Sequence, residues 1–325
     1  MPEHRFDVVG IGNAIVDVLS HADDAFLDRH RLAKGAMTLI DNARARALYR
    51  DMGPAVEMSG GSAANTIAGL ASFGAACAFV GKVRDDQLGE VFAHDIRSLG
   101  VHFATPPASD GPGTARCLIL VTPDAQRTMG TFLGACVELG PEDVTQELIG
   151  AARVTYLEGY LWDPPRAKDA FRRAIALAHD AGREVALTLS DAFCVGRWRA
   201  EFQALVAGEV DILFANEAEL TSLYQVARFD DALQAVRGKC RLAALTRSEK
   251  GSVVLSGEEV HVIDRAPVAH VVDTTGAGDL YAAGFLYGYT RGRSPADCGR
   301  LGSLAAAEVI SHLGARPEVL LDSLL

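Results

Sequence analysis

The stretch DTTGAGDLYAAGF, residues 273–285, places two glycines and an aspartate directly ahead of an alanine-rich amphipathic run. If a helix begins near Ala277, the backbone N–H groups of Gly276, Ala277 and Gly278 find no partner inside it and point outward at the positive end of its dipole. Such a turn can receive an anion. Asp279 then lies beside that pocket as the only carboxylate in reach. The alternative, that Asp279 only complements the helix dipole by about 0.3–1 kcal/mol, stays open.

Two better-known glycine motifs do not fit this chain. The segment GIGNAI (10–15) follows a strand-like run, but Ile15 stands where a dinucleotide-binding fold needs its third glycine. A Walker A loop fails as well, because Gly81-Lys82 is followed by valine instead of serine or threonine. The sequence therefore places any phosphate-binding site at the turn 273–279.

Composition and charge exclude several functional classes. The 325 residues, 49% of them hydrophobic, are enough for one large α/β domain or two modest ones. The net charge is −11 and no basic run is present, so we expect no nucleic-acid partner. The longest apolar run, residues 66–81, is too short for a membrane span of about 20 residues and is broken by glycine and serine. No secretory signal is evident at the N-terminus.

The six cysteines are dispersed and form no CxxC or Cys/His cluster. Neither a zinc site nor a disulfide framework is predicted from this spacing. Reduced thiols in a cytoplasmic enzyme are the expected state. The cysteines stand at positions 77, 117, 136, 194, 240 and 298.

The hydrophobic pattern predicts an α/β fold with a mainly parallel central sheet flanked by helices. Short runs that are apolar throughout alternate with helical segments such as 164–182 and 217–227, as in a sheet covered on both faces. Residues 17–58 and 102–135 have hairpin-like sequence and are predicted to form a small β lid inserted into a single domain, 1–325. The predicted strands are 6–11, 76–80, 154–158, 184–189, 211–215, 242–246 and 252–255.

Asn216 and Glu219 follow one of these strands and open a helix. Asparagine followed three residues later by glutamate is itself a capping box, which is one interpretation. The other is that the amide and the carboxylate hold waters of a magnesium ion, which keeps most of its hydration shell. Both interpretations can hold at once.

Two further segments carry candidate binding residues. Gly60 and Gly61 would bring a backbone turn close to a ligand, and Asn65 lies about one helical turn further on. Asn13 and Asp17 come just after the first strand, where a carboxylate can accept two hydrogen bonds from a vicinal diol. Local backbone bonding by Asn65 and turn capping by Asp17 remain the alternatives.

The order of these segments resembles the PfkB/ribokinase family of small-molecule kinases along nearly the whole chain. That family's fold is ribokinase-like, with a β-sheet lid. Ser248 departs from the family pattern, in which a glycine is usual. The matching segments are SGGSAANTIAGLASFG (59–74), VGKVRDDQLGE (80–90), NEAE (216–219), LTRSEKGSVV (245–254) and VVDTTGAGDLYAAGFLYG (271–288).

Within the family the chain is most similar to the adenosine kinases, through residues 111–117, 156–165 and 188–198. Ser62 stands where ribokinase-like members commonly carry lysine, and Glu158 stands where some sugar kinases keep a substrate-binding acid. The resemblance thus favours a nucleoside acceptor, with adenosine first. The alternatives are a sugar kinase of the ribose or fructose type and a nucleoside-binding protein without catalysis.

For the acceptor, the resemblance implies that Asp17 holds ribose hydroxyls, with Asn13, Gly60, Gly61 and Asn65 closing around the sugar. It implies a kinase that binds ATP and a small nucleoside or sugar. We expect a monomer or homodimer with no nucleic-acid or membrane partner.

For the phosphoryl group, the resemblance implies that Asp279 accepts the proton of the 5′-hydroxyl as it attacks ATP. The amides of Gly276, Ala277 and Gly278 would meet the charge on the phosphoryl oxygens, and Arg127 of the lid would add a positive charge.

The cofactors implied by the resemblance are ATP, Mg²⁺ and a monovalent cation such as K⁺. Thr246 and Gly251 would border ATP, Asn216 and Glu219 would hold Mg²⁺ through water, and the positions matching the family's monovalent-cation site include Asp273 and Thr275. Glu318 replaces a serine of that cation site.

Overall fold

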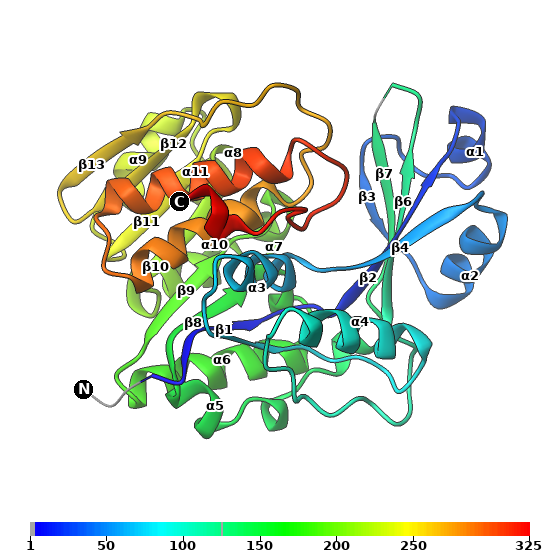
Figure 1. Cartoon of the computed structure of the whole chain (residues 1–325), viewed down its shortest axis with the longest axis horizontal. Helices are drawn as coiled ribbons and strands as arrows, with labels where there is room; N and C mark the ends of the chain where they lie inside the picture. Colours follow the sequence, from blue (N-terminus) through cyan, green and yellow to red (C-terminus); the bar gives the residue numbers. More distant parts are fainter. Residues whose placement is uncertain (1–3, 125) are drawn as a thin grey trace.

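The computed structural model describes residues 4–124 and 126–325 and contains a large, mainly parallel sheet (Figure 1). Its eight strands follow the order β13-β12-β11-β10-β9-β8-β1-β5. The β11–β12 and β12–β13 pairs are antiparallel, and the other neighbouring strands are parallel. The bounds are β1 (Phe6–Ile11), β5 (Cys77–Val80), β8 (Ala152–Glu158), β9 (Glu184–Thr188), β10 (Ile212–Asn216), β11 (Leu242–Thr246), β12 (Ser252–Ser256) and β13 (Glu259–Ile263).

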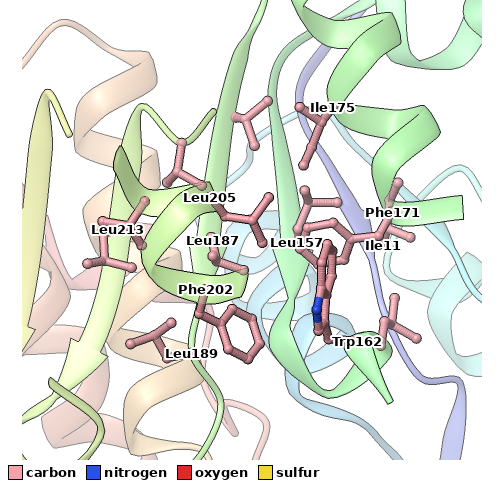
Figure 2. Packing of buried hydrophobic residues seen from close by; sticks show 14 of the residues in the cluster. Ile11, Leu157, Trp162, Phe171, Ile175, Leu187, Leu189, Phe202, Leu205 and Leu213 are labelled. Atoms are coloured by element: carbon pink, nitrogen blue, oxygen red, sulfur yellow. The ribbon is translucent and has the colours of Figure 1, made fainter. Parts of the chain in front are cut away.

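The central strands form because they are apolar on both faces and both faces are covered. Figure 2 shows part of one layer, in which Leu157 lies on the side of Trp162 and Phe171, and Leu213 lies on the side of Leu205. Helices α5, α6, α7, α8 and α9 cover this face. Their bounds are α5 (Gln146–Gly150), α6 (Pro165–Asp180), α7 (Ala192–Gly208), α8 (Glu217–Tyr224) and α9 (Phe229–Val236).

The opposite face is covered by α3, α4, α10 and α11. Helices α3 and α10 lie close together, because a side chain at Gly69 would overlap Leu280 and Ala283. In the first turns of the two helices, Ser62 and Asn65 on α3 contact Asp279 on α10. The bounds are α3 (Ser62–Ser72), α4 (Gln87–Ser98), α10 (Ala277–Thr290) and α11 (Pro295–Val309).

A second, smaller sheet, called here the lid sheet, stands beside the main body (Figure 1). Its strand order is β3-β7-β6-β2-β4, and α1 and α2 cover one of its faces through Val18, Leu48 and Leu118. The bounds are β2 (Ile15–His21), β3 (Met37–Leu39), β4 (Ala55–Gly60), β6 (Ala115–Val121), β7 (Arg127–Phe132), α1 (Asp24–Arg29) and α2 (Asn42–Asp51).

The structure confirms the predicted α/β architecture, with a mostly parallel central sheet flanked by helices and a small second sheet. The lid strands fall within 15–60 and 115–132. Assignment of residues 1–325 to one domain, with lid segments at about 17–58 and 102–135, stays a prediction. Met1–Glu3 and Ala125 lie outside the described residues. Within the described ranges, no helix combines the length and apolar character needed to cross a bilayer.

Candidate active site

The turn before α10 adopts a conformation that suits an anion. Helix α10 begins at Ala277, as predicted, and Gly276 is left-handed with φ of 78°. In the part of the chain described, the amides of Gly276 and Gly278 have no hydrogen-bond acceptor. The amide of Ala277 differs from the prediction, because it donates to the carbonyl of Thr274 over 3.3 Å, a long bond that closes a turn. Two amides, rather than three, are therefore available to a phosphate.

The carboxylate of Asp279 points across to α3. Ser62 Oγ donates to Oδ1 over 2.6 Å, and Asn65 Nδ2 donates to Oδ2 over 3.1 Å. Burial raises the pKa of Asp279, and the bonds from Ser62 and Asn65 oppose this rise by favouring the ionised form. Asp279 is thus presented as an oriented carboxylate beside the turn.

The acceptor side of the site, defined here as Asp17, Gly60, Gly61 and Asn65, lies where the lid meets α3. Asp17 is on β2, and a Cβ at Gly60 would overlap its carboxylate. Gly61 has φ of 96°, and a Cβ there would collide with the carbonyl of Asn13. Burial raises the pKa of Asp17 to about 7, against the opposing charges of arginines nearby. The glycine pair therefore lets the carboxylate lie against the backbone.

Glu158 lies next to the acceptor side, and its carboxylate accepts hydrogen bonds from other residues of the protein. Its carboxylate accepts from the backbone of Asn13 (3.3 Å), from Asn13 Nδ2 (2.5 Å) and from the backbone of Ala63 (2.9 Å). Only 1% of the residue is exposed, and burial raises the pKa of its carboxyl to about 7. Glu158 thus fixes Asn13 and the start of α3, and Asn13 turns its amide nitrogen inward.

Asn216 and Glu219 form the capping box of α8. Asn216 donates to Glu219 from its backbone (3.0 Å) and from Nδ2 (2.5 Å), and Glu219 N donates to Asn216 Oδ1 over 2.9 Å. Burial raises the pKa of Glu219 to about 7. The capping interpretation is confirmed, and both side chains also border the cavity described next.

A cavity of about 560 Å³ joins many of the predicted residues at the carboxyl ends of the parallel strands. Ser62 lines it from α3, next to the residues that Asp279 contacts. The predicted residues Asn13, Asp17, Gly60, Gly61 and Asn65 do not line it; Asn65 connects them to it through Asp279. Those that line it are Asn216, Glu219, Thr246, Gly251, Gly276, Ala277, Gly278 and Asp279.

Arg127 extends from the lid onto the turn before α10. Its guanidinium donates to the carboxylate of Asp273 and to the hydroxyl of Thr275. Asp273 also accepts from the backbone amides of Thr275 and Gly314, each over 2.9 Å. With these donors in place, Asp273 and Thr275 do not fit a monovalent cation, and Glu318 lies exposed near His312. Within the described residues, no cluster of three or more His, Cys, Asp or Glu side chains is arranged for a metal.

Sequence reasoning missed Arg316, in the loop after α11. Its Nε donates to Asn65 Oδ1 over 3.4 Å, so it reaches the acceptor side from 251 positions away. Ser62 was noted only as a replacement for lysine, although it contacts Asp279. No local sequence pattern indicates either role. Both roles become evident only because α3 packs against α10 and against the 313–320 loop in the folded chain.

Free amides beside an oriented carboxylate, at the edge of a parallel sheet and under a β lid, define a phosphotransferase that acts on an alcohol group. The model of the pfkB family of carbohydrate kinases matches residues 51–320, and the chain belongs to this family. The prediction of this family and enzyme class is confirmed.

The similar solved structures include adenosine kinases and a probable sugar kinase, which confirms the predicted likeness to the adenosine kinase branch. Adenosine kinase from Sinorhizobium meliloti is 57% identical, with a TM-score of 0.94 and 98% of each chain covered. A probable sugar kinase from Rhizobium etli CFN 42 is 54% identical, with a TM-score of 0.94, covering 99% of this chain and 98% of that one. The 5-dehydro-2-deoxygluconokinase of Geobacillus thermodenitrificans is 26% identical over 82% of this chain and 83% of its own.

Proposed function

We propose that this protein transfers the γ-phosphate of ATP to the 5′-hydroxyl of a ribonucleoside, with adenosine as the first candidate and AMP as product. The observation that carries the proposal is the composition of the lid face on which Asp17 lies. A nucleoside combines a polyhydroxyl end with a flat, largely apolar base, so its site needs both kinds of surface.

The register of the lid sheet puts Asp17 beside an apolar row. Asp17 pairs with Met58 and Cys117, while the next row on the same face contains Leu19, Val56 and Ile119. Side chains two apart on a strand share a face, so this row continues from the carboxylate. Helices α1 and α2 cover the other face, and Val56 remains 58% exposed. A diol held by Asp17 would thus place a nucleobase against apolar side chains.

The chemistry follows from the residues around Asp279. Its carboxylate would accept the hydroxyl proton as the oxygen attacks the γ-phosphorus, and ADP leaves. The amides of Gly276 and Gly278 are already oriented toward the charge that develops on the phosphoryl oxygens. Arg127 would hold the lid against the turn and add positive charge, and closure would keep water from the reacting phosphate.

The ATP side is proposed to be the 560 Å³ cavity, bordered by Thr246 and Gly251. Asn216 and Glu219 fit a hydrated magnesium ion held through water, since both residues border the same cavity and need not contact the ion directly. When bound, Mg²⁺ supplies charge neutralisation of the triphosphate. We further propose a cytoplasmic enzyme in purine salvage, a monomer or homodimer.

The similar proteins support a nucleoside as the phosphate acceptor, and some of them also support a sugar as the alternative. A relative of 57% identity is an adenosine kinase, whereas a relative of 54% identity is a probable sugar kinase and one of 26% identity is a 5-dehydro-2-deoxygluconokinase. Glu158 would favour a sugar if its carboxylate faced the acceptor, but its oxygens accept from Asn13 and Ala63. Because these hydrogen bonds occupy the Glu158 carboxylate, they favour a nucleoside over a sugar as the acceptor.

The decisive experiment measures ADP release with MgATP and a panel of nucleosides, ribose and fructose. We expect the highest kcat/KM with adenosine, and a kcat of Asp279→Asn that is lower by about 10²–10⁴-fold. Turnover of sugars but of no nucleoside would replace the proposal with a sugar kinase. Thermal stabilisation by nucleosides without any ADP formed would indicate a binding protein.

A further inference from the structure

Arg316 has a buried hydrogen-bond donor with no partner. Its Nη2 is closed off from solvent and has no acceptor among the residues that the structure describes. Burial lowers the pKa of its guanidinium only to about 10, so the group is charged at neutral pH. Leaving a buried charged donor unpaired is costly, and such donors usually meet a ligand or an ordered water.

The location of Arg316 indicates which ligand it would meet. Its Nε contacts Asn65 Oδ1, and the amide nitrogen of Asn65 contacts Asp279, so the guanidinium lies one residue away from the catalytic carboxylate. Asp17 on the lid and Asp95 on α4 are the acidic groups that act on its charge. Asp95 already accepts from Ser59 Oγ over 2.7 Å. Asp17 faces the acceptor side.

A vicinal diol matches this pair of groups. An ionised carboxylate only accepts hydrogen bonds and a guanidinium only donates them, whereas each hydroxyl does both. Asp17 can take the hydroxyl hydrogens while Arg316 donates to a hydroxyl oxygen. Neither residue alone satisfies both sides of the hydroxyl.

We propose that Arg316 is a substrate-binding residue that donates from Nη2 to one of the two ribose hydroxyls whose hydrogens Asp17 accepts. This inference rests on the proposed function, because it assigns the sugar of the nucleoside to that place. It also gives Arg316 a second task, since its Nε holds the Asn65 amide with the nitrogen toward Asp279.

The test combines variants with substrate analogues. kcat/KM is measured for wild type and Arg316→Met with adenosine, 2′-deoxyadenosine and 3′-deoxyadenosine. Wild type should lose about tenfold or more on one analogue, the size expected for a hydrogen bond to a charged donor. Arg316→Met should show a similar loss on adenosine and little further loss on that analogue. If the loss caused by Arg316→Met and the loss caused by removing a hydroxyl multiply with each analogue, the role of Arg316 is overturned.

Arg173→Met is the control, because Arg173 lies on α6 and donates from Nε to the carbonyl of Val144. It should show the wild-type loss on each analogue. If Arg316→Met does not fold, Arg316→Lys gives the same comparison, since lysine keeps the charge but lacks the Nη2 donor. Wild type that turns over no nucleoside overturns the proposed function together with this inference, whereas active wild type with independent losses overturns this inference alone.

Discussion

Asn65 on α3 donates to Asp279 on α10 over 3.1 Å, although 214 positions separate the two residues in the chain. The bond lies at the point where the acceptor side meets the ATP cavity. Its partner bond, from Ser62 to the other oxygen, comes from the same helical turn. The orientation of the Asp279 carboxylate, the proposed general base, therefore depends on how closely α3 packs on α10.

Replacing Asp279 by asparagine should abolish proton acceptance and leave the phosphate amides unchanged. We expect kcat to fall by about 10²–10⁴-fold while ATP still binds, because general-base catalysis commonly contributes that much. Steady-state ADP release and calorimetric titration with MgATP measure the two quantities. Turnover close to wild type would remove Asp279 from the role of base.

Ser62→Ala should change the pH dependence of the reaction. Ser62 donates to the ionised carboxylate, so its removal raises the pKa of Asp279 further above the ordinary value. The base must be ionised, so the acid limb of the kcat/KM profile should move to higher pH, with a smaller effect well above that limb. Ser98→Ala, on the exposed part of α4, is the control. An unmoved acid limb would show that Ser62 does not tune the base.

Gly60→Ala should weaken acceptor binding selectively. The new methyl group would overlap the Asp17 carboxylate and displace it from the sugar hydroxyls. We expect KM for the nucleoside to rise at least about tenfold, a loss of one hydrogen bond to a charged group, with KM for ATP little changed. Gly208→Ala, where an added Cβ meets nothing within 4 Å, is the control. Equal effects on both substrates would contradict the assigned place of Asp17.

Arg127 should make activity independent of potassium. Its guanidinium donates hydrogen bonds to Asp273 and Thr275, the residues at which a monovalent cation was predicted from the sequence. We expect wild-type turnover to be similar in sodium, potassium and choline salts of equal ionic strength, and Arg127→Ala to lower kcat through loss of lid contact and charge. Strong activation of wild type by potassium would mean that Arg127 leaves Asp273 during turnover.

Features written into neighbouring residues were predictable from the sequence. The strand runs, the helix start at Ala277 and the capping box at Asn216 each depend on a short local pattern, and the structure has all three. The family resemblance followed from the order of such segments. The lid was predictable as hairpin-like sequence, although its strands pair across more than 90 residues.

Features that depend on two distant segments were not predictable. The bonds of Arg316 to Asn65 and of Arg127 to Asp273 join residues 251 and 146 positions apart. The hydrogen bond from the amide of Ala277 to the carbonyl of Thr274 was also not predictable, because it depends on the conformation of the turn itself. Local pattern gives the residue types at a site, whereas packing decides which of them stay free for a ligand.

Glu158 should make the protein less stable as the pH rises. Burial holds its proton in the folded state up to about pH 7, whereas the unfolded chain releases it near pH 4.5. Between these values the folded state binds more protons, so its stability is greatest below the unfolded pKa and falls as the pH rises through the folded one. Glu158→Gln removes this ionisation, so its melting temperature should fall less than that of wild type between pH 5 and 8.

Thermal unfolding at several pH values gives the comparison, with Glu147→Gln on the exposed side of α5 as control. The control should follow wild type, because the other acids whose pKa is raised by burial, Asp17, Glu219 and Asp279, are unchanged and contribute the same direction of pH dependence in both proteins. Identical slopes for Glu158→Gln and wild type would mean that the donors from Asn13 and Ala63 keep Glu158 ionised in the folded state, with its pKa near the ordinary value.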